Sequence, residues 1–409
     1  MQQQVSRKRF TFRVVLGLTL AVLLIYGETL GAGFTFWDDD VYVTRNPLIQ
    51  ELSPGSVGRL FTQFSNCNYH PLTYFTWMAE YSLVGLSPWL YHLDNVLLHV
   101  GVGVLVFLLT RRLLEGAHGE LAALLVAVLF LVHPLRVESV AWIAERKDVL
   151  CVLFYLASLL VYLKFIDEGP DKRSYGLSLA LFLAALLSKA MAISLPAVQV
   201  LLLVLRRSAS RKQLLLLAPF WVLSVVFAVL AYLAQAACGA VTPIHGDTFL
   251  AHLLTVVKAL AFYAQKLVVP HPLSARYVVE PAAGLGEPQV IVGLILVALA
   301  TWAAWRSFGR RRLLFFGLGF FAVTWAPVSG IVPTSTLVAD RYMYLPALGL
   351  LWPLGAAAGA ALRGAVESRR HATAWVGLTL LLGTALVWGV LARERVHAWT
   401  DGIVLWQDA

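Results

Sequence analysis

Charged residues are scarce in this chain of 409 residues. Asp, Glu, Lys and Arg make up 13% of the sequence, whereas hydrophobic residues make up 59%. Soluble globular proteins carry about 25% charged residues. The deficit comes from long apolar runs, which need lipid around them. The composition therefore excludes an ordinary soluble domain and predicts an all-α polytopic integral membrane protein.

Cysteine is also scarce, and no single basic patch is present. Cys67, Cys151 and Cys238 follow neither a zinc-ligand nor a redox spacing. Cys151 falls in an apolar run, while Cys67 and Cys238 fall in polar segments and could pair, although nothing in their spacing suggests a bridge. The formal charge is +9, but the basic residues stand in short clusters between apolar runs. This distribution argues against a nucleic-acid partner and is typical of membrane topology.

The apolar runs predict about 11 transmembrane helices, each needing roughly 20 residues unless tilted or short. Arg7, Lys8, Arg9 and Arg13 precede the first run, and no small-residue cleavage site follows it, so we expect an uncleaved span and a cytoplasmic N-terminus. An odd number of spans then places the C-terminus outside. The runs are 14–33, 90–110, 121–135, 149–165, 175–188, 190–205, 214–234, 290–305, 313–328, 342–362 and 372–392.

Two stretches need an explicit choice. Residues 175–205 are short for two crossings, but one crossing would place the basic cluster at 206–212 outside. We therefore expect a hairpin with Lys189 at its outer tip. Residues 252–268 are apolar but contain two lysines, and treating them as a span would place the arginines at 310–312 outside. An interfacial amphipathic helix on the outer face fits better.

The longest outer segments are then 34–89 and 235–289, and the first begins with Asp38, Asp39 and Asp40. Adjacent carboxylates near a bilayer repel one another, and desolvation raises their pKa. The triplet could bind a metal, provide a general base or cap a following helix. Because it leaves a span directly, its first members are the best anchored. We rank Asp38 first as a base and Asp39 next, with Asp40 facing water or capping the next turn.

Aromatic residues fill 66–95, which is typical of a belt at the membrane surface. His70 could instead contact a sugar. The second outer segment, 133–148, is dense in ionisable side chains beside two spans, which marks a site by default. The alternative is a set of self-paired surface ions. Lys189 could contact a ligand or extend to the interface.

Arg341 opens the tenth span, where its guanidinium could grip a phosphate in bidentate fashion. A local surface pair with Asp340 is the alternative. Carboxylates from one outer loop and cations from others suit a lipid-phosphate substrate, since cations bind the phosphate while a carboxylate activates an acceptor hydroxyl.

Four ordered motifs carry a family resemblance. They are FTFWDDDVYVTRNPLIQ at 34–50, HPLTYFTWM at 70–78, HPLRVESVAWIAERKDVL at 133–150 and ADRYMYLPALG at 339–349. Together they resemble the bacterial relatives of the transmembrane-and-tetratricopeptide-repeat O-mannosyltransferases, which belong to the GT-C superfamily of membrane glycosyltransferases. The resemblance extends from about residue 30 to the C-terminus. It implies a polyprenyl- or dolichyl-phosphate-linked sugar as donor and, in eukaryotic members, a protein hydroxyl as acceptor.

The resemblance also implies roles for particular residues. The acidic pair of the family matches Asp38 and Asp39. The remaining positions that match the family motifs are His133, Glu138, Arg146, Asp148, Lys189, Asp340, Arg341, Tyr342 and Tyr344. Of these, all but Asp340 and Tyr344 are expected to bind the donor phosphate and sugar. Family members continue into tetratricopeptide repeats, whereas this sequence ends about where the first would begin. We therefore expect a single GT-C-like transmembrane domain over 1–409, and either the sequence is a fragment of a longer protein or the protein lacks the repeat domain.

These observations predict an enzyme that transfers a mannose-like hexose from a polyprenyl-phosphate donor to a hydroxyl of a protein or glycan on the non-cytoplasmic face. Arg exceeds Lys in this Ala- and Leu-rich chain, which is typical of a GC-rich bacterial genome. We therefore expect the protein to lie in a bacterial inner membrane. No cofactor is expected to be obligatory, since side chains can neutralise a lipid monophosphate, although a divalent metal at the aspartate triplet stays open. The alternatives are a non-enzymatic membrane platform for a repeat domain and a transporter of lipid-linked sugars. A transporter site would lie near the bilayer midplane instead.

Overall fold

The chain forms a bundle of helices in a computed structural model that describes residues 2–114, 119–169, 171–240, 244, 246, 248–333 and 336–409, with side chains described from residue 9 onward. Several helices begin where the sequence provides a cap. Ser53, Asp171, Thr248 and Asp401 each accept a hydrogen bond from a first-turn backbone N–H of α2, α8, α12 and α17. The helices are α1 (Gln2–Tyr26), α2 (Pro54–Thr62), α3 (Pro71–Val84), α4 (Pro88–Leu113), α5 (Gly119–Val132), α6 (Val137–Ala141), α7 (Arg146–Glu168), α8 (Lys172–Ser188), α9 (Leu195–Leu205), α10 (Arg211–Leu215), α11 (Ala218–Ala236), α12 (Phe249–Val268), α13 (Pro288–Ser307), α14 (Arg312–Trp325), α15 (Ala347–Glu367), α16 (His371–His397) and α17 (Gly402–Asp408).

The chain is an all-α, multi-pass integral membrane protein. Within the described residues, 7 helical segments are long and apolar enough to cross a bilayer, and α5 with the segment 134–141 adds a bent pair at 66°. Two further apolar helices, 190–205 and 312–328, are shorter. Each predicted apolar run contains a helix, but 11 crossings stay a prediction. The 7 segments are Arg9–Gly31, Pro88–Leu113, Ile143–Glu168, Arg211–Ala236, Pro288–Ser307, Ala347–Glu367 and His371–His397.

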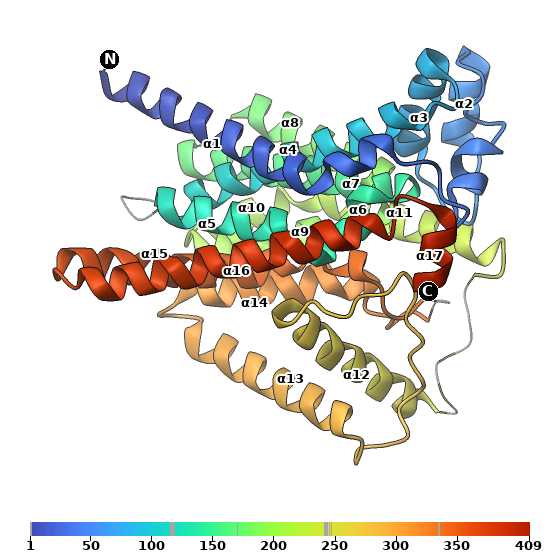
Figure 1. The fold of residues 1–409 in the computed structure, drawn as a ribbon. Coiled ribbons are helices and arrows are strands. Elements are labelled where there is room, and N and C mark those ends of the chain that lie inside the picture. The colour runs from blue at the N-terminus through green and yellow to red at the C-terminus, as the bar shows by residue number, and fades with distance from the viewer. Residues whose placement is uncertain are drawn as a thin grey trace.

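The two ends of the chain lie at opposite ends of the helical bundle (Figure 1). Helix α4 packs against α1, α5 and α7, and α15 packs against both α5 and α14. Two glycines allow the closest of these approaches, because a Cβ on Gly317 would lie 2.2 Å from the Gly349 carbonyl oxygen. Small residues at such crossings are typical of helix packing in membranes. The orientation of the bundle across the membrane stays a prediction.

The polar segments between the helices hold structure of their own. Residues 34–89 contain α2 and α3, and a disulfide between Cys67 and Cys238 ties this segment to the end of α11. The sequence left that pairing open. The prediction of an aromatic belt at the membrane surface is wrong for several residues, since Trp77 and Tyr91 are fully buried in the core.

Helix α12 forms where an amphipathic helix was predicted and packs along α13. The Lys258 ammonium pairs with Glu287, the residue just before α13, at 2.5 Å. Its location at the membrane interface stays a prediction.

Candidate active site

The segment predicted as a second outer loop is deeply buried. Every residue from 131 to 152 is buried, and the chain passes through the short helical turns 134–136 and 143–145 around α6 before entering α7. The reading of this segment as surface ions is therefore wrong, although its ions are indeed paired. Charges at such burial are stable only when paired and hydrogen-bonded.

Six ionisable side chains from three parts of the sequence meet here and form the charge cluster. Its members are Glu138, Glu145, Lys147, Asp148, Lys189 and Arg341. Glu145 is the centre, because Oε1 lies 3.1 Å from Lys147 Nζ and 3.3 Å from Arg341 Nε, while Oε2 lies 3.3 Å from Lys189 Nζ. Each described cation of the cluster is thus matched to a carboxylate.

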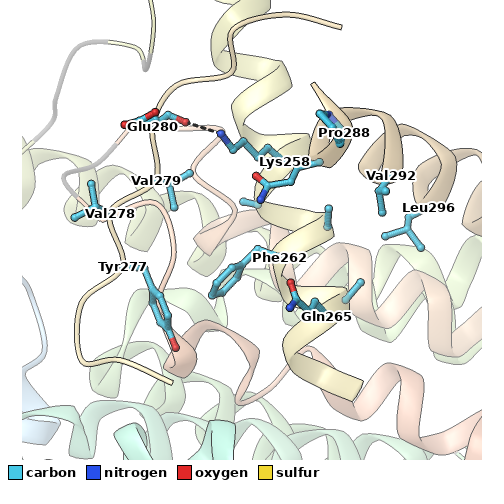
Figure 2. A pocket seen from close by; sticks show the side chains of 14 residues that line it. Lys258, Phe262, Gln265, Tyr277, Val278, Val279, Glu280, Pro288, Val292 and Leu296 are labelled. Carbon is cyan, nitrogen blue, oxygen red and sulfur yellow. Dashed lines mark hydrogen bonds between the residues drawn. The ribbon is translucent and has the colours of Figure 1, made fainter. Parts of the chain in front are cut away.

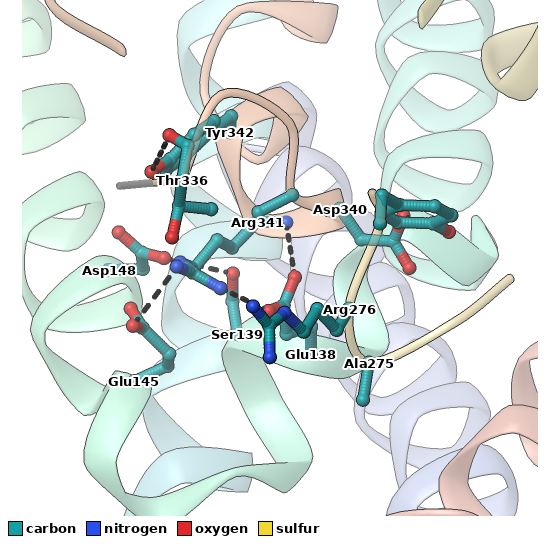
Figure 3. Close-up of polar contacts among 12 residues, drawn as sticks. Glu138, Ser139, Glu145, Asp148, Ala275, Arg276, Thr336, Asp340, Arg341 and Tyr342 are labelled. Carbon is teal, nitrogen blue, oxygen red and sulfur yellow. Dashed lines mark hydrogen bonds and ion pairs between the residues drawn. The ribbon is translucent and has the colours of Figure 1, made fainter. Parts of the chain in front are cut away.

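Arg341 belongs to the charge cluster and does not pair with its neighbour in sequence. Its backbone N–H donates to Glu138 Oε2 at 2.8 Å, and its guanidinium pairs with both Glu138 and Glu145 (Figure 3). Burial opposes the charged form, yet these carboxylates hold the pKa of Arg341 well above its usual value. Asp340 instead accepts a hydrogen bond from the Tyr277 hydroxyl at 2.8 Å. The proposed surface pair of Asp340 with Arg341 is therefore wrong.

Lys189 lies at the break between α8 and α9, not at an exposed tip. Its ammonium lies 2.6 Å from Asp148 Oδ1, and its side chain is 14% exposed. Burial alone would lower the pKa of Lys189, but Asp148 and Glu145 raise it above the usual value, so the ammonium stays protonated. Ser139 Oγ donates to the other Asp148 oxygen at 3.2 Å. The interpretation of Lys189 as a side chain extending to the interface is therefore wrong.

The three adjacent aspartates have three different environments. Asp39 is buried, where Oδ2 accepts from the Thr35 N–H at 2.8 Å and its hydroxyl at 2.9 Å, and Oδ1 accepts from the Ala144 N–H at 2.9 Å. Burial raises the pKa of Asp39 to about 6 despite these hydrogen bonds. Asp39 therefore fastens the first outer segment to the turn that holds Glu145.

Asp38 has a partly exposed side chain, and it lies near enough to the charge cluster for Lys147, Glu145 and Arg341 to act on its pKa. Burial raises the pKa of Asp38, while the nearby Lys147 ammonium acts in the opposite direction. Asp40, whose side chain is 23% exposed, lies 3.7 Å from the exposed Arg45 guanidinium. Asp38 is thus a partly exposed carboxylate beside the charge cluster, and its role as a base stays a prediction.

Other nominated residues lie apart from the charge cluster. Arg146 is fully buried and directs its guanidinium to Glu80, to Asn95 Oδ1 at 2.8 Å and to the Tyr91 carbonyl at 2.7 Å. His133 Nε2 lies 3.2 Å from the Leu267 carbonyl, and Nδ1 accepts from a backbone N–H. These contacts hold helices together, and the functional roles of Arg146 and His133 stay predictions.

His70 and Tyr342 lie nearer to the charge cluster. His70 is buried at the start of α3, and burial together with Lys147 and Lys189 holds its pKa well below the usual value. Tyr342 donates its hydroxyl to the Thr336 carbonyl at 3.3 Å, and its ring lies 5.2 Å from the Arg341 guanidinium carbon. Both could contact a bound sugar, and this stays a prediction.

Glu145 and Lys147 are the two members of the charge cluster that sequence reasoning did not nominate, and Lys147 also has aromatic neighbours. Its ammonium lies over the Tyr42 ring, 4.6 Å from the ring centre, and 5.9 Å from that of Trp142. Cations are attracted to aromatic faces at such distances. The sequence offered one signal, since Lys147 stands between Arg146 and Asp148 in the second outer segment.

A groove of ≈ 810 Å³ opens between α12 and α13 (Figure 2). Phe262, Val292 and Leu296 contribute apolar lining, and Lys258 lies at one side of it. Tyr277 also lines the groove, and its hydroxyl contacts the residue that precedes Arg341. Only 11% of the α13 span is buried, so this helix presents most of its apolar surface outward. Through Tyr277 and Asp340, the groove lies two residue contacts away from Arg341.

Metal binding has no dedicated cluster in the described part of the chain. There, no group of three or more His, Cys, Asp or Glu side chains is arranged to hold a metal ion. What the arrangement does offer is a set of fixed cations for a phosphate and a partly exposed carboxylate for a proton.

Comparison with known proteins identifies distant relatives. The chain is 31% identical to Protein O-mannosyl-transferase TMTC4 of Homo sapiens over 185 residues, which is 40% of this chain and 25% of that protein. It is 34% identical to TMTC2 of Mus musculus over 162 residues, or 38% of this chain and 19% of the relative. The mouse TMTC4 match is 25% identical but extends over 88% of this chain and 57% of the relative. The chain thus spans well under two thirds of the length of these relatives.

Among solved structures, ArnT from Cupriavidus metallidurans bound to undecaprenyl phosphate is similar with a TM-score of 0.47 and 16% identity, covering 97% of this chain and 76% of that chain. No protein-family model matches the sequence. The sequence matches establish that the chain is a distant homologue of the TMTC O-mannosyl-transferases over its membrane part.

Proposed function

We propose that the protein is a membrane glycosyltransferase that transfers a mannose-like hexose from a polyprenyl-phosphate donor to an acceptor hydroxyl. The observation that carries this proposal is the charge cluster with Asp38 beside it. A stable core needs no such assembly, because buried charges are costly even when paired. Distant homology to O-mannosyl-transferases supports the same chemistry.

The reaction needs one base and a site for one leaving group. Asp38 takes the proton of the acceptor hydroxyl, whose oxygen forms a bond to the anomeric carbon of the sugar. The bond between that carbon and the phosphate oxygen breaks, and its electron pair stays on the polyprenyl phosphate. Arg341 and Lys189 stabilise the charge that develops there, as preorganised cations do in other transfer reactions.

The groove between α12 and α13 is the proposed location of the isoprenoid chain. Its apolar side chains suit a hydrocarbon tail, and Tyr277 at the groove contacts Asp340, the residue that precedes Arg341. A donor held this way has its tail among apolar side chains and its phosphate near Arg341. His70 and Tyr342 are proposed to contact the sugar.

The remaining features follow from the charge pattern of the sequence. We propose 11 crossings, a cytoplasmic N-terminus and an outer active site in a bacterial inner membrane. The acceptor is proposed to be a protein or glycan hydroxyl. Side chains alone are proposed to neutralise the leaving phosphate, so that the reaction needs no metal.

The direct test is transfer from labelled polyprenyl-phosphate mannose by purified protein in nanodiscs. Release of polyprenyl phosphate together with labelled acceptor or free sugar is expected. Lys189→Met is the matched variant, because it removes a cation of the charge cluster while keeping a side chain of similar length. It should transfer sugar more slowly than the wild type. Absence of any transfer or hydrolysis by the wild type across a panel of polyprenyl-phosphate hexoses would favour a non-enzymatic platform.

A further inference from the structure

Arg276 lies on an anchored part of the connection between α12 and α13. Its N–H donates to Ser274 Oγ at 3.2 Å, and the same hydroxyl donates to the Arg276 carbonyl at 2.8 Å. The next residue, Tyr277, donates its hydroxyl to Asp340 at 2.8 Å and accepts from the Ser274 N–H at 3.0 Å. The backbone of Arg276 is therefore fixed beside the turn that carries Arg341.

The Arg276 side chain points from this connection into the site. Figure 3 shows it directed toward Glu138 and Ser139, on the side of the charge cluster where Arg341 enters. The residue is exposed, and no ion pair of its guanidinium is present in the described ranges. A basic side chain in this position is open to a molecule that arrives from outside the cluster.

The other cations of the site differ in this respect. Lys147, Lys189 and Arg341 each lie within 3.3 Å of at least one carboxylate of the charge cluster. An incoming phosphate must compete with those carboxylates for each of them. An arginine without a carboxylate partner carries no such competition, and its planar guanidinium can bind two phosphate oxygens at once.

We propose that Arg276 is a donor-binding residue that captures the phosphate of the polyprenyl carrier at the mouth of the charge cluster. This inference rests on the proposed function. The tail of the carrier occupies the groove that Tyr277 lines. Because Tyr277 directly follows Arg276, a phosphate at this end of the groove lies close to Arg276. Arg341 and Lys189 then act on the phosphate after it has been captured.

The test measures binding of undecaprenyl phosphate and of uncharged undecaprenol to protein in nanodiscs, together with initial rates of sugar transfer. Arg276→Gln should weaken undecaprenyl phosphate binding by roughly tenfold or more, as expected for a lost charge-assisted contact. Binding of undecaprenol should be unchanged. The affinity of Arg276→Lys for undecaprenyl phosphate should lie between those of the wild type and Arg276→Gln, because lysine keeps the charge but lacks the planar guanidinium.

Arg59→Gln is the matched control, since Arg59 is another exposed arginine and contacts only Ser56 within α2 among the described side chains. Its phosphate binding should equal that of the wild type. Arg276→Gln with wild-type binding and an unchanged KM for the donor, in a wild type that transfers sugar, would overturn this inference and leave the proposed function intact. A wild type that binds undecaprenyl phosphate no better than undecaprenol would overturn both. If Arg276→Gln lowers the thermal stability, the lysine variant decides.

Discussion

Alanine at Asp38 and at Asp39 should have opposite consequences, although the two residues are adjacent. In Asp39→Ala the N–H groups of Thr35 and Ala144 lose their acceptor inside the protein. A buried donor left without a partner costs about 1–3 kcal/mol, so the two together cost roughly 2–6 kcal/mol, and the loss of a buried charge offsets part of this cost. The thermal unfolding midpoint should therefore fall clearly.

Asp38→Ala removes a partly exposed carboxylate whose side chain makes no hydrogen bond in the described part of the protein. Substitutions at such positions usually change stability by less than about 0.5 kcal/mol. Loss of a general base, by contrast, should reduce the rate of transfer by roughly 10²–10⁴-fold. The expected signature is a stable protein that binds donor but turns it over slowly.

The assay pairs thermal unfolding in nanodiscs with initial rates, each rate being corrected for the folded fraction. Asp38→Asn serves as the matched substitution, because it keeps the shape of the side chain and removes its basicity. The reasoning is refuted if Asp38→Asn keeps a near-normal rate, or if Asp39→Ala unfolds at the wild-type temperature. In the first case the base must be sought among the carboxylates of the charge cluster.

Four further outcomes are expected. Because the pKa of Asp38 is raised and the base must be ionised, transfer should fall on acidification with a midpoint above the usual aspartate range, and a flat profile down to pH 4 would contradict this. Arg341→Ala leaves buried carboxylates unpaired and should destabilise the fold by about 3–5 kcal/mol as well as weaken donor binding, which unfolding and titration measure separately. Gly317→Ala should lower the unfolding midpoint through a clash with α15, whereas Gly176→Ala, with open space around it, should not. Cys67→Ser should lower the midpoint too, because it opens a bridge across 171 residues, and maleimide should label the freed partner without prior reduction.

Hydropathy was sufficient to locate the long apolar helices, because a bilayer demands long apolar segments whose backbone is satisfied internally. The apolar run 252–268 coincides with α12, and its two lysines distinguished this helix from a span. Hydropathy gave no account of α2 and α3, which pack inside the first outer segment. Their buried aromatic residues, such as Trp77, have the same composition as an interfacial belt.

The sequence motifs located the site, but they did not show which of its side chains point toward one another. Successive residues on a helix point roughly 100° apart, so composition cannot tell which of Arg146 and Lys147 faces the charge cluster. The structure turns Arg146 toward Glu80 and Lys147 toward Glu145. Pairing between distant residues was equally hidden, as with Arg341 and Glu138.

The last helix has a practical consequence for handling the protein. Asp408, next to the final residue, accepts from the Ala275 N–H at 3.0 Å and pairs with Arg395 at 2.6 Å. Ala275 immediately precedes Arg276, so α17 helps to hold the segment that carries that arginine. The N-terminus lies at the opposite end of the bundle (Figure 1), and tags for binding measurements belong there.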